Sequence, residues 1–239
     1  CVDETGLLRA EYPWQGVCRG YVHRDCLMKN ITFTLLTSLA VLSTAAVADD
    51  GFVSLFDGKA LDKWENPYEW GEVKAVNREI HLTANKKFFL CTKEKFADFI
   101  FEVEILLPEG KANSGIMFRA HKKPNKVFGY QAECDGSERR WSGGLYDEGR
   151  RKWLHPKKPN NSESGKAFTN GPGKAFKRND WNQYRIECRG NKIKISVNGT
   201  LCTEFVDDMD AEGYIGLQHH GEKGQTYRFR NPRIKVLKK

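Results

Sequence analysis

The sequence of residues 49–239 predicts an all-β fold, a sandwich or barrel built from short strands. After residue 48, no stretch keeps the i, i+3, i+4, i+7 apolar spacing of an amphipathic helix for long. Short segments of alternating apolar and polar residues recur instead up to the C-terminus, bounded by Gly, Asn, Asp or Pro. No internal repeat divides this region, so we expect a single domain from residue 49 to residue 239.

The clearest strand in the first half is 99–106, where every second residue is a large apolar one. Asn77-Arg78 lies between two alternating segments and predicts a hairpin. Leu61 and Trp64 have a spacing that suits a short helical turn packed under a sheet. The other strands that we expect in this half are 51–56, 72–76, 79–82, 88–92 and 113–121.

The middle of the chain contains a strand and an aromatic segment within residues 129–146. Because side chains alternate across a strand, Gln131, Glu133 and Asp135 share one face of it. A solvated outer face and a binding site both give such a row of polar groups. Residues 147–180 follow, rich in Lys, Arg, Asn, Gly and Pro. Connections of this length are often functional lids or irregular segments, so we expect a loop over one face.

The C-terminal part of the chain contains a strong hairpin signal. Asn198-Gly199 separates two alternating segments, and both central positions of a type I′ turn need positive φ. The strands expected here are 181–188, 192–197, 201–205, 213–221 and 227–237.

The N-terminal part has the pattern of a secretory signal peptide at residues 28–48. Met28-Lys29-Asn30 precedes a short apolar run, and Ala46-Val47-Ala48 supplies a cleavage site of small residues. We therefore expect an exported protein, periplasmic or secreted, with no membrane span after cleavage. A retained anchor is the alternative, although the apolar run is short for a bilayer. We interpret residues 1–27 as an over-extended gene start and assign them no fold.

Charge and cysteine content narrow the partners. The chain has a net charge of +8, which suits encounters with acidic glycans, but no basic run interleaved with aromatic residues indicates nucleic acid. After the signal segment four cysteines remain, at 91, 134, 188 and 202. An exported protein can form a disulfide from them, or leave all four free. The absence of a C-x-x-C pair argues against structural zinc.

Several short motifs in order resemble the 3-keto-disaccharide hydrolase domain family. The motifs are Gly51–Lys59 with Leu61 and Trp64, Asn113–Ile116, Gly129-Tyr130 with Glu133, Gly144–Tyr146, Trp181-Asn182, Val197–Gly199, Gly216–Gln218 with His220-Gly221, and Phe229–Asn231. The resemblance implies a concanavalin A-like jelly roll of two antiparallel sheets, one of them concave. It also implies an enzyme acting on an oligosaccharide or other glycoside whose sugar 3-hydroxyl is already oxidised.

Polar residues on three expected strands define the candidate site. Gln131, Glu133 and Asp135 form the first set, Arg119 and His121 the second, and Gln218 and His220 the third. Each strand has a largely apolar opposite face, so the three sets together predict a polar concavity. His121, followed by Lys122-Lys123-Pro124, also fits a surface position at a strand end.

A ketone at C3 makes the C2 hydrogen acidic, so a base can remove it and the aglycone can leave from C1 before water adds. This chemistry needs a tuned base, an oxyanion stabiliser and an acid. We assign Glu133 or His220 as the base, Arg119 as the clamp on the oxyanion and Asp135 as the second acid–base group. The predicted substrate-binding residues are Asn113, Gln131, Trp141, Tyr146 and Gln218.

Four alternatives remain open at this point. A divalent metal held by His220, Glu133 and Gln218 can replace the arginine's role. Glu133 and Asp135 can instead act as an ordinary carboxylate pair on an intact glycoside. The domain can be a non-catalytic, lectin-like carbohydrate-binding module, because jelly rolls host both functions. A cell-surface adhesion domain is the fourth alternative.

Overall fold

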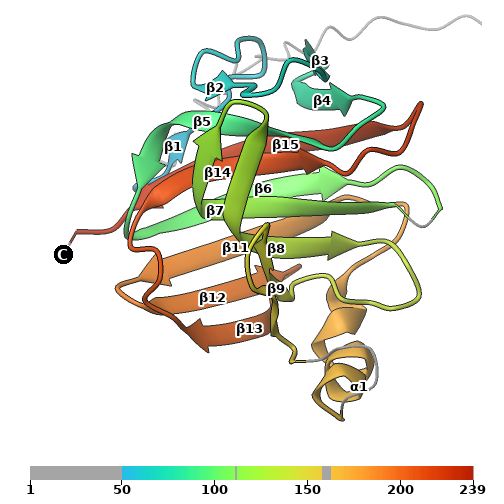
Figure 1. The fold of residues 1–239 in the computed structure, drawn as a ribbon, viewed down its shortest axis with the longest axis vertical. Coiled ribbons are helices and arrows are strands. Elements are labelled where there is room, and N and C mark those ends of the chain that lie inside the picture. Colours follow the sequence, from blue (N-terminus) through green and yellow to red (C-terminus); the bar gives the residue numbers. More distant parts are fainter. Residues whose placement is uncertain (1–49, 111, 158–162, 239) are drawn as a thin grey trace, which may run out of the picture. The chain divides into compact units, whose positions relative to one another are not determined.

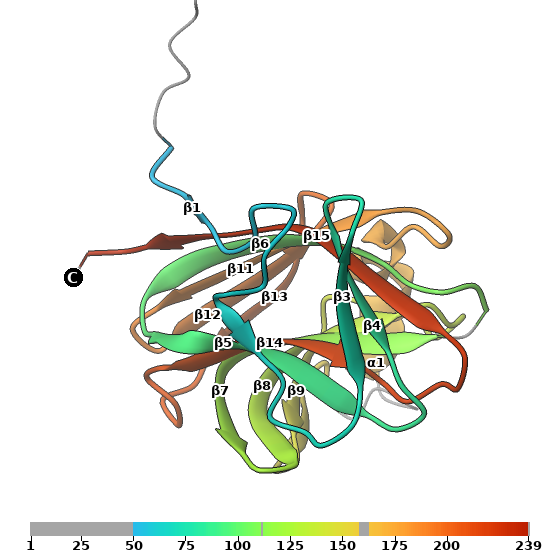
Figure 2. The ribbon, with the colours of Figure 1, turned by 90° about the horizontal axis from the view of Figure 1, so that it is seen from above.

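The computed structural model describes residues 50–110, 112–157 and 163–238, which form two antiparallel β-sheets packed face to face (Figures 1 and 2). Sheet A contains, in spatial order, β13 (Thr200–Val206), β12 (Lys192–Val197), β11 (Asn182–Arg189), β6 (Phe99–Leu106), β15 (Thr226–Val236), β4 (Glu79–Thr83) and β3 (Glu72–Val76), with β1 (Val53–Ser54) beside β15. Sheet B contains β10 (Lys152–His155), β9 (Leu145–Glu148), β8 (Lys126–Asp135), β7 (Asn113–Lys123), β14 (Gly213–His219), β5 (Phe88–Phe96) and β2 (Trp64–Glu65). The predicted β-sandwich is confirmed.

The core lies between the inner faces of the two sheets. The alternation predicted for β6 is observed, with Phe99 and Phe101 fully buried on the core side. Sheet B contributes Phe118, Tyr130 and Ala132 to the same cluster. Because every second residue of these strands is in the core, the intervening residues face outward and are available for a site.

Both predicted hairpin turns are confirmed. Asn77 and Arg78 have φ of 50° and 63° between β3 and β4, and Asn198 and Gly199 have φ of 49° and 80° between β12 and β13. Positive φ at both central positions matches the right-handed twist of the paired strands, which is why such pairs favour Asn and Gly.

Two local predictions have different outcomes. Residues 147–180 are not one long loop, since they contain the end of β9, then β10, the helix α1 (Glu163–Asn170) and the 3₁₀ turn η1 (Pro172–Ala175). The predicted short helical turn is present as a single hydrogen-bonded turn, in which the N–H of Trp64 donates to the carbonyl oxygen of Leu61 at 2.8 Å. Trp64 also begins β2, where it is buried and its indole nitrogen donates a hydrogen bond of 2.8 Å to the carbonyl oxygen of Leu55.

The four cysteines at 91, 134, 188 and 202 are all buried and free, so the disulfide alternative is not realised among the described residues. Within the described ranges, no helix has the length and apolar character needed to span a membrane. The predicted signal peptide at 28–48 and the segment 1–27 lie outside the described residues.

Candidate active site

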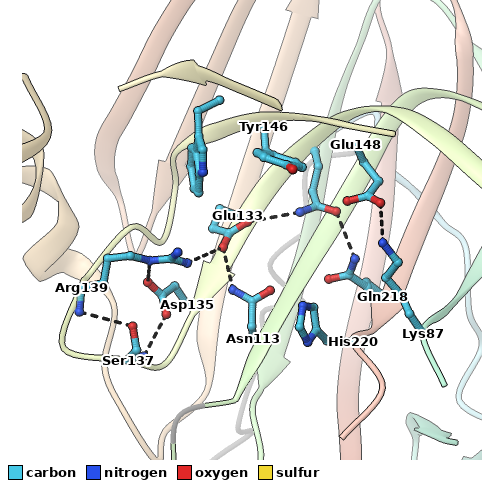
Figure 3. A pocket seen from close by; sticks show the side chains of 12 residues that line it. Lys87, Asn113, Glu133, Asp135, Ser137, Arg139, Tyr146, Glu148, Gln218 and His220 are labelled. Carbon is cyan, nitrogen blue, oxygen red and sulfur yellow. Dashed lines mark hydrogen bonds and ion pairs between the residues drawn. The ribbon is translucent and has the colours of Figure 1, made fainter. Parts of the chain in front are cut away.

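A hollow of about 480 Å³ opens on the outer face of sheet B (Figure 3). Its walls come from five strands, from the loops that follow β8 and β14, and from Lys87 just before β5. The lining residues are Lys87, Asn113, Gln131, Glu133, Asp135, Ser137, Arg139, Tyr146, Glu148, Trp153, Gln218 and His220. The structure therefore brings together seven of the nine predicted site residues, and leaves out Arg119 and Trp141.

Strand β8 supplies the acidic floor of the hollow. Tyr130, Ala132 and Cys134 face the core, so Gln131, Glu133 and Asp135 point to the opposite face, as the alternation predicted. All three are nevertheless buried, because neighbouring side chains of sheet B enclose them. The polar row on β8 is thus the floor of the hollow and not a solvated face.

Gly115 on β7 makes room for this row. It lies opposite Glu133 in the strand register. A Cβ atom at this position would come within 2.2 Å of the Cδ atom of Gln131. Any side chain at position 115 would displace the amide of Gln131. The absence of a side chain at Gly115 therefore leaves room for Gln131 at the floor of the hollow.

Arg139 joins the two carboxylates of the floor. Its Nε atom donates to Asp135 Oδ2 at 2.7 Å, and its Nη2 atom donates to Glu133 Oε1 at 2.9 Å. The guanidinium carbon lies 3.7 Å from the ring centroid of Trp141, which gives the cation an aromatic support. Sequence reasoning missed Arg139, although its position four residues after Asp135 in a short turn was a usable signal.

The two carboxylates differ in acidity. Burial raises the pKa of Glu133 to about 7, against the opposing effects of the Asn113 hydrogen bond and the Arg139 charge. Burial acts in the same direction on Asp135, but hydrogen bonds from Ser137 and the Arg139 guanidinium outweigh it and lower the pKa. At neutral pH, Asp135 is therefore ionised while Glu133 exchanges its proton readily. Carboxyl groups whose pKa values are pushed apart are characteristic of acid–base sites.

Three amide side chains line the hollow beside Glu133. Asn113 Nδ2 donates to Glu133 Oε1 at 2.6 Å, and Gln131 Nε2 donates to Glu133 Oε2 at 3.2 Å. Gln218 Nε2 donates in turn to Gln131 Oε1 at 3.3 Å. Within the described part of the chain, Gln218 Oε1 is the one buried side-chain oxygen or nitrogen without a hydrogen-bond partner. An unpaired buried acceptor is costly, so a ligand hydroxyl group would stabilise it.

His220 lies at the rim, next to Asn113 and across it from Glu133 (Figure 3). Its Nδ1 atom is 2.8 Å from Glu222 Oε1, and the Tyr227 hydroxyl donates to Glu222 Oε2 at 2.6 Å. A carboxylate at Nδ1 favours the tautomer with the proton there, which leaves Nε2 for substrate. Sequence reasoning predicted His220 but missed Glu222, which follows the end of β14.

Aromatic residues line the side of the hollow formed by β9 and β10. Tyr146 is half-buried and lies edge-on to Trp153, with ring centroids 5.2 Å apart. Trp141, predicted to contact sugar, is buried beneath Arg139 and does not line the hollow. Trp153 occupies the lining position, so the aromatic surface available to a sugar ring consists of Tyr146 and Trp153.

Arg119, predicted as the oxyanion clamp, lies outside the hollow. A β-bulge between Phe118 and His121 breaks the alternation of β7, and Arg119 has a φ of 44° there. Its buried guanidinium donates to Asp98 Oδ1 at 3.0 Å and to the carbonyl oxygens of Ala97, Gly190 and Asp210. The residue therefore has a structural role, and the bulge is the reason that the face assignment was wrong.

His121 also lies outside the hollow. It is half-buried, and its Nε2 atom is 2.7 Å from Asp210 Oδ1. The sequence alternative of a strand-end position away from the site agrees with this placement.

The predicted metal ligands do not form a coordination set. Glu133 is paired with Arg139, and His220 is bonded to Glu222 through Nδ1. Across the described residues, no group of three or more His, Cys, Asp or Glu side chains is arranged to hold a metal ion. A cation at Glu133 would also meet the guanidinium charge, so we derive no step through a metal.

The sandwich resembles solved structures of carbohydrate-related proteins. A "putative glycosyl hydrolase" from Parabacteroides distasonis matches with a TM-score of 0.54 at 20% identity, over 78% of this chain and 99% of that chain. The carbohydrate-binding module CBM66 from Bacillus subtilis matches with a TM-score of 0.50 at 17% identity, over 73% and 96% of the respective chains. The lumenal domain of VIP36, bound to Ca²⁺ and Man₃GlcNAc, gives 0.51 at 8% identity, over 79% and 89%. At these identities the likeness concerns the fold.

Sequence comparison gives the more specific result. No curated protein is significantly similar to the chain. The family model described as "3-keto-alpha-glucoside-1,2-lyase-like domain" matches residues 51–235, which include all lining residues of the hollow and every strand except the last residue of β15. The match confirms the resemblance predicted from the motifs and connects the protein to carbohydrate chemistry. The chain belongs to the family of 3-keto-α-glucoside-1,2-lyase-like domains.

Proposed function

We propose that the protein is an enzyme that cleaves glycosides carrying a ketone at C3 of the sugar. It removes the C2 proton, eliminates the aglycone from C1 and allows water to add to the unsaturated product. The observation that carries the proposal is the buried pair of Glu133 and Asp135 with opposite pKa shifts beneath Arg139.

Glu133 is the base in this proposal. The C3 ketone stabilises the carbanion formed at C2, so a carboxylate of raised pKa is basic enough to take that proton. Burial raises the pKa of Glu133 to about 7, so this carboxyl can both take up and release a proton near neutral pH. A base whose pKa is close to the working pH combines availability with proton affinity.

Arg139 stabilises the enolate in this proposal. Its side chain is 36% exposed, so the guanidinium can reach a substrate oxygen while Asp135 holds its Nε atom. Removing one donor from an oxyanion site typically lowers the rate about 10²–10³-fold. Asp135 serves as the anionic anchor of Arg139, because an ionised group of lowered pKa is a poor acid. This assignment replaces Arg119 as clamp and Asp135 as acid.

His220 protonates the leaving oxygen through Nε2. The C2–H and C1–O bonds break, the C1=C2 double bond forms, and the two protons pass through Glu133 and His220. No oxidant or reductant is consumed, and hydration of the double bond gives the free 3-keto sugar. Glu222 supports this role because its carboxylate holds the imidazole through Nδ1 and leaves Nε2 for the substrate.

A non-catalytic carbohydrate-binding module is the second candidate. The amides of Asn113, Gln131 and Gln218 and the unpaired Gln218 Oε1 would serve binding alone. The two candidates differ in what Glu133→Gln would do. A binding module would lose little affinity, whereas the proposed enzyme would lose its base.

The decisive experiment compares a 3-keto-glucoside with its unoxidised parent, each with and without a chelator. We expect wild-type protein to release the aglycone from the keto form alone, and Glu133→Gln to reduce the rate at least about 10²-fold. Glu187→Gln on β11 of the other sheet is the matched control and retains turnover. Binding of both sugars without turnover would exclude the enzyme. Loss of turnover on chelation would show that a metal ion enters the site with substrate.

A further inference from the structure

A second hollow of about 400 Å³ adjoins the first. The two share Asp135 and Ser137, which line both. Its remaining lining residues are Arg140, Gly173, Lys174, Phe176 and Arg178. They come from the turn after β8 and from η1 and the segment after it, so this hollow extends the first one beyond the edge formed by Ser137 and Arg139.

The second hollow is strongly basic. Arg140, Lys174 and Arg178 line it, and its one carboxylate, Asp135, is already held by Arg139. Arg178 pairs with the exposed carboxylate of Glu138. Within the described ranges, neither Arg140 nor Lys174 forms an ion pair with an acidic side chain. The hollow therefore presents two cations without an acidic partner.

Close backbone packing positions these cations. A Cβ atom on Gly173 would lie 2.1 Å from the carbonyl oxygen of Arg140, so a glycine is required where η1 meets the turn. Arg140 itself has a φ of 58°, which is unusual for a residue other than glycine. The Thr169 hydroxyl of α1 donates to the carbonyl oxygen of Arg139 at 3.0 Å. The turn with its two arginines is thus fixed against α1 and η1.

We propose that the second hollow is an anion subsite for a second sugar unit of the substrate, attached to the cleaved sugar on the Arg139 side and not through the bond cleaved beside His220 (Figure 3). The group bound is a carboxylate, sulfate or phosphate on the unit linked to the sugar in the first hollow. Half-buried Phe176 offers an apolar surface beside the cations for the ring that carries the anion. This inference rests on the proposed function only in assigning the first hollow to the cleaved sugar.

The test measures binding without turnover, with unoxidised disaccharides as probes. The probes are glucosyl-glucose, glucuronosyl-glucose and a glucosyl-glucose sulfated on its non-reducing unit, compared by calorimetry. We expect the acidic disaccharides to bind about five- to tenfold more tightly than the neutral one at low salt, and about twofold at roughly 0.5 M salt. The two acidic probes distinguish a carboxylate from a sulfate as the better ligand.

The variant that tests the subsite is Arg140→Gln combined with Lys174→Gln. It should remove the preference for acidic disaccharides and leave affinity for the neutral one unchanged. Lys59→Gln with Lys192→Gln is the matched control, since it removes the same charge from exposed positions outside both hollows. Thermal unfolding checks that each variant folds. If the double variant does not fold, Lys174→Gln alone replaces it.

Two results would overturn the subsite. One is that neutral and acidic disaccharides bind equally, or that none binds. The other is that Lys59→Gln with Lys192→Gln loses the preference for acidic disaccharides as fully as Arg140→Gln with Lys174→Gln. That result would attribute the preference to the net charge of the protein. The outcome is separable from the proposed function. A preference for acidic disaccharides without turnover of any 3-keto-glucoside would refute the enzyme and retain the subsite.

Discussion

Replacing Glu133 with glutamine should change how stability depends on pH. Burial raises the pKa of Glu133 from its ordinary value of 4.5 to about 7 in the folded protein. Between these values the folded state binds more protons than the unfolded state, so the stability of the wild-type protein falls as pH rises. One pKa unit corresponds to about 1.4 kcal/mol, which gives a cost of about 3 kcal/mol above pH 7. Glu133→Gln removes this cost.

Urea unfolding followed by tryptophan fluorescence at a series of pH values measures the effect. The free energy of unfolding of Glu133→Gln minus that of the wild-type protein should rise by about 1.4 kcal/mol per pH unit between about pH 5 and 7. Above pH 7 this difference should stay constant. Asp207→Asn, at a position outside the hollow, is the control. Because the pKa of Asp207 is lowered, its stability difference from wild type should be flat in this range. A flat difference for Glu133→Gln as well would refute the raised pKa and remove the main support for Glu133 as base.

Three further predictions concern the frame of the site. Arg119→Met should lower the free energy of unfolding by about 3–5 kcal/mol, because it removes the cation paired with Asp98 and the donor to three carbonyl groups. Thermal unfolding measures this loss, and a value below about 1 kcal/mol would contradict the structural role. Glu222→Gln should reduce kcat about tenfold with little change in KM and move the pH profile of kcat, whereas a change confined to stability would show that Glu222 does not act through His220. Gly115→Ala should cost about 1–3 kcal/mol by overpacking against Gln131, and unchanged stability in urea would contradict the close packing.

The strands could be predicted because alternation is a local property of the sequence. The apolar period of β6 and the Asn-Gly turn after β12 each reflect a constraint that neighbouring residues satisfy by themselves. The elements within 147–180 were missed because they have few apolar anchors. Helix α1 buries only one large apolar residue, Phe168, and so gives almost no periodic signal.

The errors at the site have different physical causes. Arg119 was assigned to the wrong face because a β-bulge changes the alternation, and no residue pattern of β7 marks its position. Arg139 and Glu222 were missed because both lie after the end of a strand, where loop conformation sets the side-chain direction. Sequence alternation therefore predicts the part of the site on the sheet, and contacts between loop and strand determine the rest.

The loop after β8 explains why the two carboxylates differ in pKa. Arg139 contacts both Glu133 and Asp135, so its charge alone does not separate them. Asp135 also accepts hydrogen bonds from the backbone N–H groups of Ser137 at 2.9 Å and Trp141 at 3.2 Å. Glu133 is bonded only by side chains. Strand β8 thus places two carboxyl groups on one face. Hydrogen bonds from the backbone of the following turn help to lower the pKa of Asp135, whereas the pKa of Glu133, which has no such bonds, is raised by burial.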